Sequence, residues 1–115
     1  MRDYLLYIRD ILENIRKAME FTEGMSFQDF LKDEKTVYAV LRCIEIIGEA
    51  SKKVPKEIRK RYPEVPWRAM AAMRDRVIHG YFGINTEIVW TTPVKDLPPL
   101  KERLQEILNE LEGEK

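Results

Sequence analysis

Apolar residues recur at intervals of three and four along most of the chain, the spacing that places them on one face of an α-helix. One stripe runs from Asp3 to about Phe21, a second begins after Asp33 and ends near Lys53, and a third lies near the C-terminus. Their members are Leu5, Ile8, Leu12, Ile15 and Met19, then Val37, Val40, Leu41, Ile44, Ile47 and Gly48, then Leu100, Leu104, Ile107 and Leu111. No segment shows the sustained alternation of a β-strand. The pattern predicts an all-α fold.

Caps and prolines divide the chain between these stripes. Ser26 followed by Asp29 predicts a short capped helix that covers the core, and Asp33 is a candidate N-cap for the second long helix. Asn85 or Thr86 can cap a segment that continues to Trp90. Residues 56–62 are limited to a short helix by Pro55, Pro63 and Pro66. The chain before and at the start of the last stripe is expected to be kinked or divided by Pro93, Pro98 and Pro99.

A third main helix is predicted from about Pro66 to His79, and it contains an arginine in an unexpected place. On a helical wheel Arg74 falls within the apolar arc, at a position where a core residue is expected. The other members of the arc are Trp67, Met70, Ala71 and Ile78. Burial of an unpaired guanidinium costs several kcal/mol, so Arg74 needs a carboxylate, a subunit interface or an anionic ligand. An ion pair with Glu45 or Glu49, or a snorkelling side chain, is the simplest explanation.

Size and charge limit the kinds of function to consider. The chain has 115 residues, of which 44% are hydrophobic, enough for one domain covering residues 1–115. Twenty basic and twenty acidic side chains give a formal net charge of zero, so binding to nucleic acid must be local. A basic patch that could guide RNA lies between Lys52 and Arg61, although basic helix ends are common on soluble proteins. The 35% of charged residues suits a helical surface with many ion pairs.

Cysteine and histidine each occur once, as Cys43 and His79. This excludes an intrachain disulfide and leaves no cysteine–histidine cluster for structural zinc, so we predict no metal and no cofactor. The N-terminus leads directly into an amphipathic pattern without the apolar core of a signal peptide, and no apolar run is long enough to cross a bilayer. We expect a cytoplasmic protein that does not contact membranes.

The segment around His79 carries the candidate chemistry. Histidine has the side-chain pKa best suited to proton transfer near neutral pH, and His79 lies close to two arginines and a tyrosine. Together, Arg74, Arg76, His79 and Tyr81 could hold a phosphodiester. The simpler alternatives are a histidine attracted by a helix C-terminus and a half-buried tyrosine that closes a turn.

The motif Arg74-x4-His79-x-Tyr81 resembles the signature of HepT-like ribonuclease toxins of the HEPN superfamily. The resemblance covers nearly the whole chain. It includes Tyr4, Ile11-Leu12, Phe21-Thr22, Ser26-Phe27, Glu45-Ile46-Ile47-Gly48-Glu49-Ala50, Tyr62-Pro63, Pro66-Trp67, Met73-Arg74 and Asp96-Leu97-Pro98. Pro93 departs from the family pattern, in which an uninterrupted helix is expected before Asp96.

The resemblance implies a HEPN-type up-and-down bundle of four to five helices that forms a two-fold homodimer, with the two motifs meeting in a shared cleft. It implies metal-independent endoribonuclease activity that leaves 2′,3′-cyclic phosphate ends. Two copies of His79 would act as base and acid, and Arg74 would hold the phosphate. Asp75 and Arg76 would support these catalytic residues.

The resemblance also implies a protein partner. This partner is a minimal nucleotidyltransferase antitoxin, which would neutralise the toxin by transferring an adenylyl group to Tyr81 and could join it in a higher assembly. An alternative from another class of function is a non-catalytic helical dimer that binds a nucleotidyltransferase or a nucleotide.

Overall fold

The computed structural model of the protein describes residues 3–78 and 83–114. In these two ranges every regular element is helical, and the only β-type pairing is an isolated antiparallel bridge between Ile78 and Ile84. The prediction of an all-α fold is therefore confirmed. None of the helices in these ranges combines the length and the apolar composition needed to cross a membrane.

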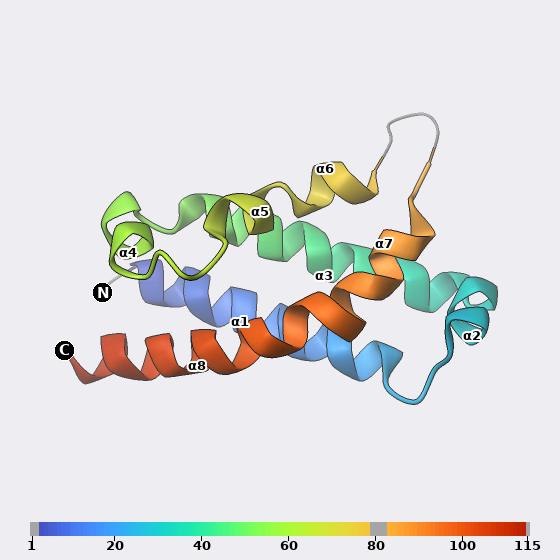
Figure 1. Cartoon of the computed structure of the whole chain (residues 1–115), viewed down its shortest axis with the longest axis horizontal. Helices are drawn as coiled ribbons and strands as arrows, with labels where there is room; N and C mark the ends of the chain where they lie inside the picture. The colour runs from blue at the N-terminus through green and yellow to red at the C-terminus, as the bar shows by residue number, and fades with distance from the viewer. Residues whose placement is uncertain (1–2, 79–82, 115) are drawn as a thin grey trace.

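Three long helices run along the longest dimension of the molecule (Figure 1). They are α1 (Asp3–Thr22), α3 (Glu34–Lys53) and α8 (Leu97–Gly113), and α1 packs against both of the others. The apolar stripes predicted for these helices pack into a common core. The side chains that are completely buried include Ile8, Ile11, Ile15, Val40, Ile44, Ile47, Leu104, Ile107 and Leu111. Hydrophobic burial along these faces is the main force that holds the bundle together.

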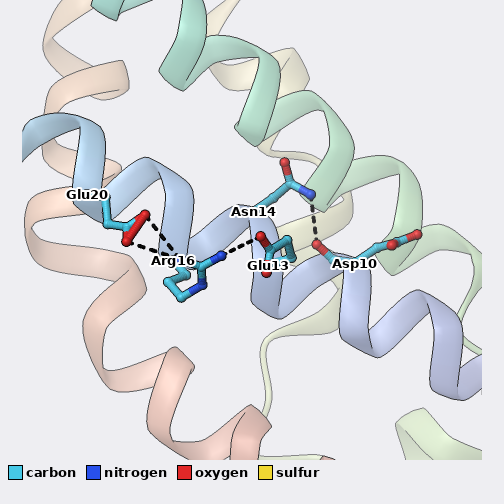
Figure 2. Close-up of polar contacts among 5 residues, drawn as sticks. All are labelled: Asp10, Glu13, Asn14, Arg16 and Glu20. Carbon is cyan, nitrogen blue, oxygen red and sulfur yellow. Dashed lines mark hydrogen bonds and ion pairs between the residues drawn. The ribbon is translucent and has the colours of Figure 1, made fainter.

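The outward face of α1 carries the ion pairs expected from the high share of charged residues. Arg16 Nη1 lies 3.0 Å from Glu20 Oε1, and a second nitrogen of Arg16 binds Glu13 (Figure 2). On the inward side, the buried Asn14 donates a hydrogen bond of 2.9 Å to the carbonyl oxygen of Asp10, which satisfies its amide without breaking the helix.

The short helix α2 (Phe27–Lys32) begins with a capping box. Ser26 Oγ accepts a hydrogen bond from the Asp29 N–H at 3.1 Å, and Asp29 Oδ2 accepts one from the Ser26 N–H at 3.0 Å. Phe30 is completely buried, with its ring centroid 5.2 Å from that of Trp90. The predicted helix that covers the core is confirmed.

Three short helices follow α3: α4 (Lys56–Arg61), α5 (Trp67–Ala71) and α6 (Met73–Val77). They line the edge of the molecule opposite α8 in the view of Figure 1, and both α5 and α6 pack on α3. Trp67 anchors the start of α5, because its buried Nε1 donates a hydrogen bond of 3.0 Å to the Tyr62 carbonyl oxygen.

The prediction of one helix from Pro66 to His79 is wrong. The chain leaves the α5 helix at Ala72 (φ −91°, ψ −1°), restarts as α6, and is already extended at Ile78. After this break Met73 and Val77 are buried while Arg74 is exposed. The predicted core position of Arg74 is therefore wrong as well, because the wheel assumed an unbroken helix.

The last part of the chain is helical from Thr86 to Gly113, in three segments. Asn85 caps α7 (Thr86–Thr91) by accepting a hydrogen bond from the Ile88 N–H, and a π-helical segment, η2 (Thr92–Asp96), connects α7 to α8. The division predicted from the prolines is confirmed, since η2 contains Pro93 and α8 starts immediately before Pro98 and Pro99.

Candidate functional site

Arg74 stands on α6 with its guanidinium at the surface and carboxylates on either side. Its side chain is 53% exposed, and its Nε lies 3.5 Å from Glu45 Oε2 on α3. Its Nη1 lies 3.9 Å from Asp75 Oδ1. Glu45 also lies 3.7 Å from Arg42 Nη1. Of the explanations offered for Arg74, the ion pair with Glu45 is confirmed.

Arg74 forms part of the wall of a surface groove of about 290 Å³ between α1, α3 and α6. The groove is lined by Tyr7, Asp10, Arg42, Glu45, Ile46, Glu49, Ala50, Lys53 and Arg74. Three cations and three carboxylates thus share one small space. An anionic group that enters must compete with carboxylates for the arginines, so anion binding here depends on how firmly each arginine is already paired.

The fold places Arg74 beside Glu45 through a close approach of α5 to α3. A Cβ added to Gly48 would lie 3.4 Å from the carbonyl oxygens of both Met70 and Ala71. Gly48 therefore permits the close packing of α5 on α3 at this point. After Ala72 the chain restarts with the Asp75 N–H bonded to the Ala72 carbonyl at 3.1 Å, which directs Arg74 toward α3.

The described residues immediately before and after residues 79–82 are paired with each other. Ile78 pairs with Ile84, and the Asn85 N–H donates a hydrogen bond of 2.7 Å to the Val77 carbonyl oxygen. The predicted catalytic residue His79 and the predicted modification site Tyr81 lie outside the described residues. The described members of the motif are Arg74, Asp75 and Arg76.

These three residues do not share one site. Asp75 is beside Arg74 and is 76% exposed. Arg76 lines a different groove of about 440 Å³, between α5, α6 and the start of α8, together with Lys95 and Asp96. The structure thus brings Arg74 and Asp75 together with Glu45 and separates Arg76 from them.

Comparison with known protein families shows the family to which the chain belongs. Residues 11–107 match the family model described as "Ribonuclease HepT-like". The chain belongs to the HepT-like ribonuclease family. No solved structure matches it.

Relatives of similar length support this assignment to the HepT-like family. A Thermococcus cleftensis protein named "Probable ribonuclease HepT" is 46% identical over 106 residues, 92% of this chain and 96% of its own length. A Methanocaldococcus jannaschii protein, provisionally named an RNase, is 45% identical over 113 residues, 98% of this chain and 93% of its own. A third, from Caldanaerobacter subterraneus and also provisionally named an RNase, is 45% identical over 102 residues, 89% of this chain and 91% of its own.

Sequence reasoning did not single out two residues of the groove in this member of the HepT-like family. Arg42, three residues before Glu45, is exposed and is the second cation that Glu45 contacts. Tyr7 comes from α1, and its ring lies 5.8 Å from Lys53 Nζ. The spacing of Arg42 and Glu45 was a visible signal for the first contact. The contact between Tyr7 and Lys53 depends on how α1 packs against α3, and no neighbouring residue in the sequence indicates it.

Proposed function

We propose that this HepT-like protein is a metal-independent endoribonuclease and the toxin of a toxin–antitoxin pair. One observation carries the proposal: the guanidinium of Arg74 is exposed at the rim of a groove, five residues before the single histidine, in a chain of a ribonuclease family. An arginine kept at the surface by a partly exposed carboxylate can exchange that partner for a phosphate.

The reaction is an intramolecular transesterification of RNA. The 2′-oxygen attacks the adjacent phosphorus and the bond from phosphorus to the 5′-oxygen breaks, which leaves a 2′,3′-cyclic phosphate and a 5′-hydroxyl. One imidazole takes the proton of the 2′-hydroxyl, and a second, protonated imidazole supplies a proton to the leaving 5′-oxygen. Arg74 offsets the charge that develops on the phosphate oxygens.

The count of histidines supports a site shared by two chains. Two imidazoles are needed in opposite protonation states, and each chain provides only His79. A two-fold homodimer with both motifs in one cleft supplies the pair. Asp75 is suited to orient a guanidinium or an imidazole, since its carboxylate already lies beside Arg74.

Tyr81 is the residue through which we propose that the nuclease activity is regulated. A nucleotidyltransferase antitoxin would attach an adenylyl group to its hydroxyl, and the added phosphodiester would bring bulk and negative charge into the cleft. That charge would compete with the RNA phosphate for Arg74. The modified toxin would then be inactive without any loss of fold.

Incubation of the unmodified protein with labelled RNA in EDTA tests the activity. We expect the wild type to leave cyclic phosphate ends and His79→Ala to leave the RNA intact, with the same circular dichroism spectrum for both proteins. If the wild type cuts none of a varied set of RNAs, the proposal fails and the non-catalytic binding dimer takes its place.

Mixed dimers test the shared site. Wild-type and His79→Ala chains are unfolded together and refolded at equal concentration. A site that needs both imidazoles retains about a quarter of the activity of an all-wild-type sample, whereas sites confined to single chains retain about half. The second result would contradict the two-histidine mechanism while leaving the nuclease activity itself established.

A further inference from the structure

We propose that the edge of the molecule built from the end of α3 and from α4, α5 and α6 binds the RNA backbone that extends away from Arg74. We call residues 52–76 the basic edge. This inference rests on the proposed ribonuclease function, because it assigns a path to the same substrate. The ligand chemistry is a run of phosphodiesters, bound without reading the bases.

Charge is distributed very unevenly along this neutral chain. The basic edge contains nine lysines and arginines and only three acidic residues, for a formal charge of +6. The remainder of the chain therefore carries −6, since the net charge is zero. A polyanion is attracted to the edge and repelled by the rest of the surface, so the charge pattern also orients the bound RNA.

The arginines of the basic edge are less often ion-paired than the described arginines elsewhere. Every described arginine outside the edge is ion-paired to a glutamate: Arg9, Arg16, Arg42 and Arg103. Within the edge, Arg59, Arg68 and Arg76 have no carboxylate within 4.0 Å among the described residues. The buried Nε of Arg59 also has no hydrogen-bond partner in that part of the chain. The exposed and unpaired guanidinium groups of Arg68 and Arg76 remain available for phosphates.

Two charged residues of the edge are ion-paired with residues of the C-terminal part of the chain, so their charges are offset. Arg61 is paired with Glu114, and Glu64 accepts a hydrogen bond of 2.7 Å from Arg103 Nε on α8. The exposed lysines Lys52, Lys56 and Lys60 have no ion pair among the described residues. Lys56 and Lys60 are four residues apart and so share one face of α4.

The distance along α3 between Arg74 and α4 determines how long an RNA must be to contact both. Arg74 is opposite Glu45, and α3 continues for eight more residues to Lys53 before the chain turns into α4. At about 1.5 Å per residue this is about 12 Å. A stacked strand advances about 3.4 Å per nucleotide, so α4 is about four nucleotides from the phosphate at Arg74. A dinucleotide bound there cannot reach α4.

The test pairs two double variants with two substrates. Lys56→Gln/Lys60→Gln removes two charges from the basic edge, and Lys17→Gln/Lys32→Gln removes two exposed lysines from α1 and α2 as the control. Affinity for a single-stranded RNA of about 20 nucleotides is measured over a range of salt concentrations in a His79→Ala background. Cleavage of that RNA and of a dinucleotide is measured with His79 present.

We expect the edge variant to bind the long RNA more weakly, with a plot of log K against log salt that is shallower by roughly 1.4, about 0.7 for each lost phosphate contact. Its kcat/KM should fall for the long RNA and stay unchanged for the dinucleotide. The control variant should match the wild type. Equal binding by all three proteins, or an equal loss in the control, would overturn the inference.

Failure of the nuclease proposal gives a different result. In that case the wild type cuts neither substrate, while the binding comparison remains measurable. Weaker binding by the edge variant alone would then support the basic edge as an RNA surface and count against catalysis.

Discussion

The Nε of Arg74 lies 3.5 Å from Oε2 of Glu45, and this ion pair joins α6 to α3 at the rim of the candidate site. The two side chains are 53% and 28% exposed, so solvent screens their attraction. Pairs of this kind contribute about 0–1 kcal/mol to stability. The contact therefore orients the guanidinium of Arg74 and adds little to the stability of the fold.

Glu45→Gln should separate binding from turnover. Loss of the carboxylate frees the positive charge of Arg74, so we expect tighter RNA binding and a lower KM. The guanidinium is then less well oriented, so kcat should fall. Steady-state kinetics on a short RNA check this, with Glu49→Gln as the control because Glu49 lines the same groove without contacting Arg74 at ion-pair distance. A parallel fall in melting temperature and activity would indicate a structural role instead.

Arg74 and Arg76 should respond differently to substitution. Arg74→Ala removes the proposed phosphate ligand, and loss of one such stabilising group lowers kcat about 10²- to 10³-fold. It should also weaken RNA binding. Arg76→Ala alters a different groove, so turnover of a dinucleotide should stay near the wild-type value. Unchanged RNA affinity in Arg74→Ala would contradict the clamp role.

The space at Gly48 accommodates the Cβ atom of an alanine but not a larger side chain. An alanine methyl would meet the Met70 and Ala71 carbonyl oxygens at 3.4 Å, an ordinary contact distance, and alanine favours a helix over glycine by about 1 kcal/mol. We expect Gly48→Ala to be neutral or slightly stabilising in urea unfolding. Gly48→Leu should destabilise by about 1–3 kcal/mol, because α5 must move away from α3. Equal stability of the two variants would disprove the close approach.

Tyr62 should make the protein sensitive to alkaline pH. Burial raises the pKa of its phenol above the ordinary value of 10.0, so the unfolded chain loses this proton at lower pH than the folded one. The associated stability is complete below pH 10 and is lost as the pH rises through the higher folded pKa.

Tyr62→Phe provides the matched control. It keeps the ring, over which the guanidinium carbons of Arg61 and Arg103 lie at 5.4 and 5.6 Å from the centroid. The variant should match the wild type in urea unfolding at neutral pH and lose less stability as the pH rises above about 10. Identical pH profiles for the two proteins would rule out this role for Tyr62.

The local features of the fold were predictable because each depends on residues close together in the sequence. The apolar stripes of α1, α3 and α8 follow from helical periodicity, and the caps Ser26, Asp33 and Asn85 act on N–H groups within three residues. The candidate ribonuclease motif was likewise found from spacing and from blocks of similar residues in order. Glu45 could be named as a partner of Arg74, but only together with Glu49.

The break at Ala72 was decided by tertiary structure, because residues 67–78 contain no glycine or proline that would end a helix. The break allows Met73 and Val77 to stay buried against the bundle while Arg74 keeps its charge at the surface. An unbroken helix would have placed that guanidinium among apolar side chains, where it lacks hydration. Sequence alone determined where the long helices α1, α3 and α8 form and which residues are candidates for the chemistry. Packing of α5 and α6 on α3 decided that Arg74 faces Glu45 and that Arg76 lines another groove, since only contacts between distant helices distinguish those orientations.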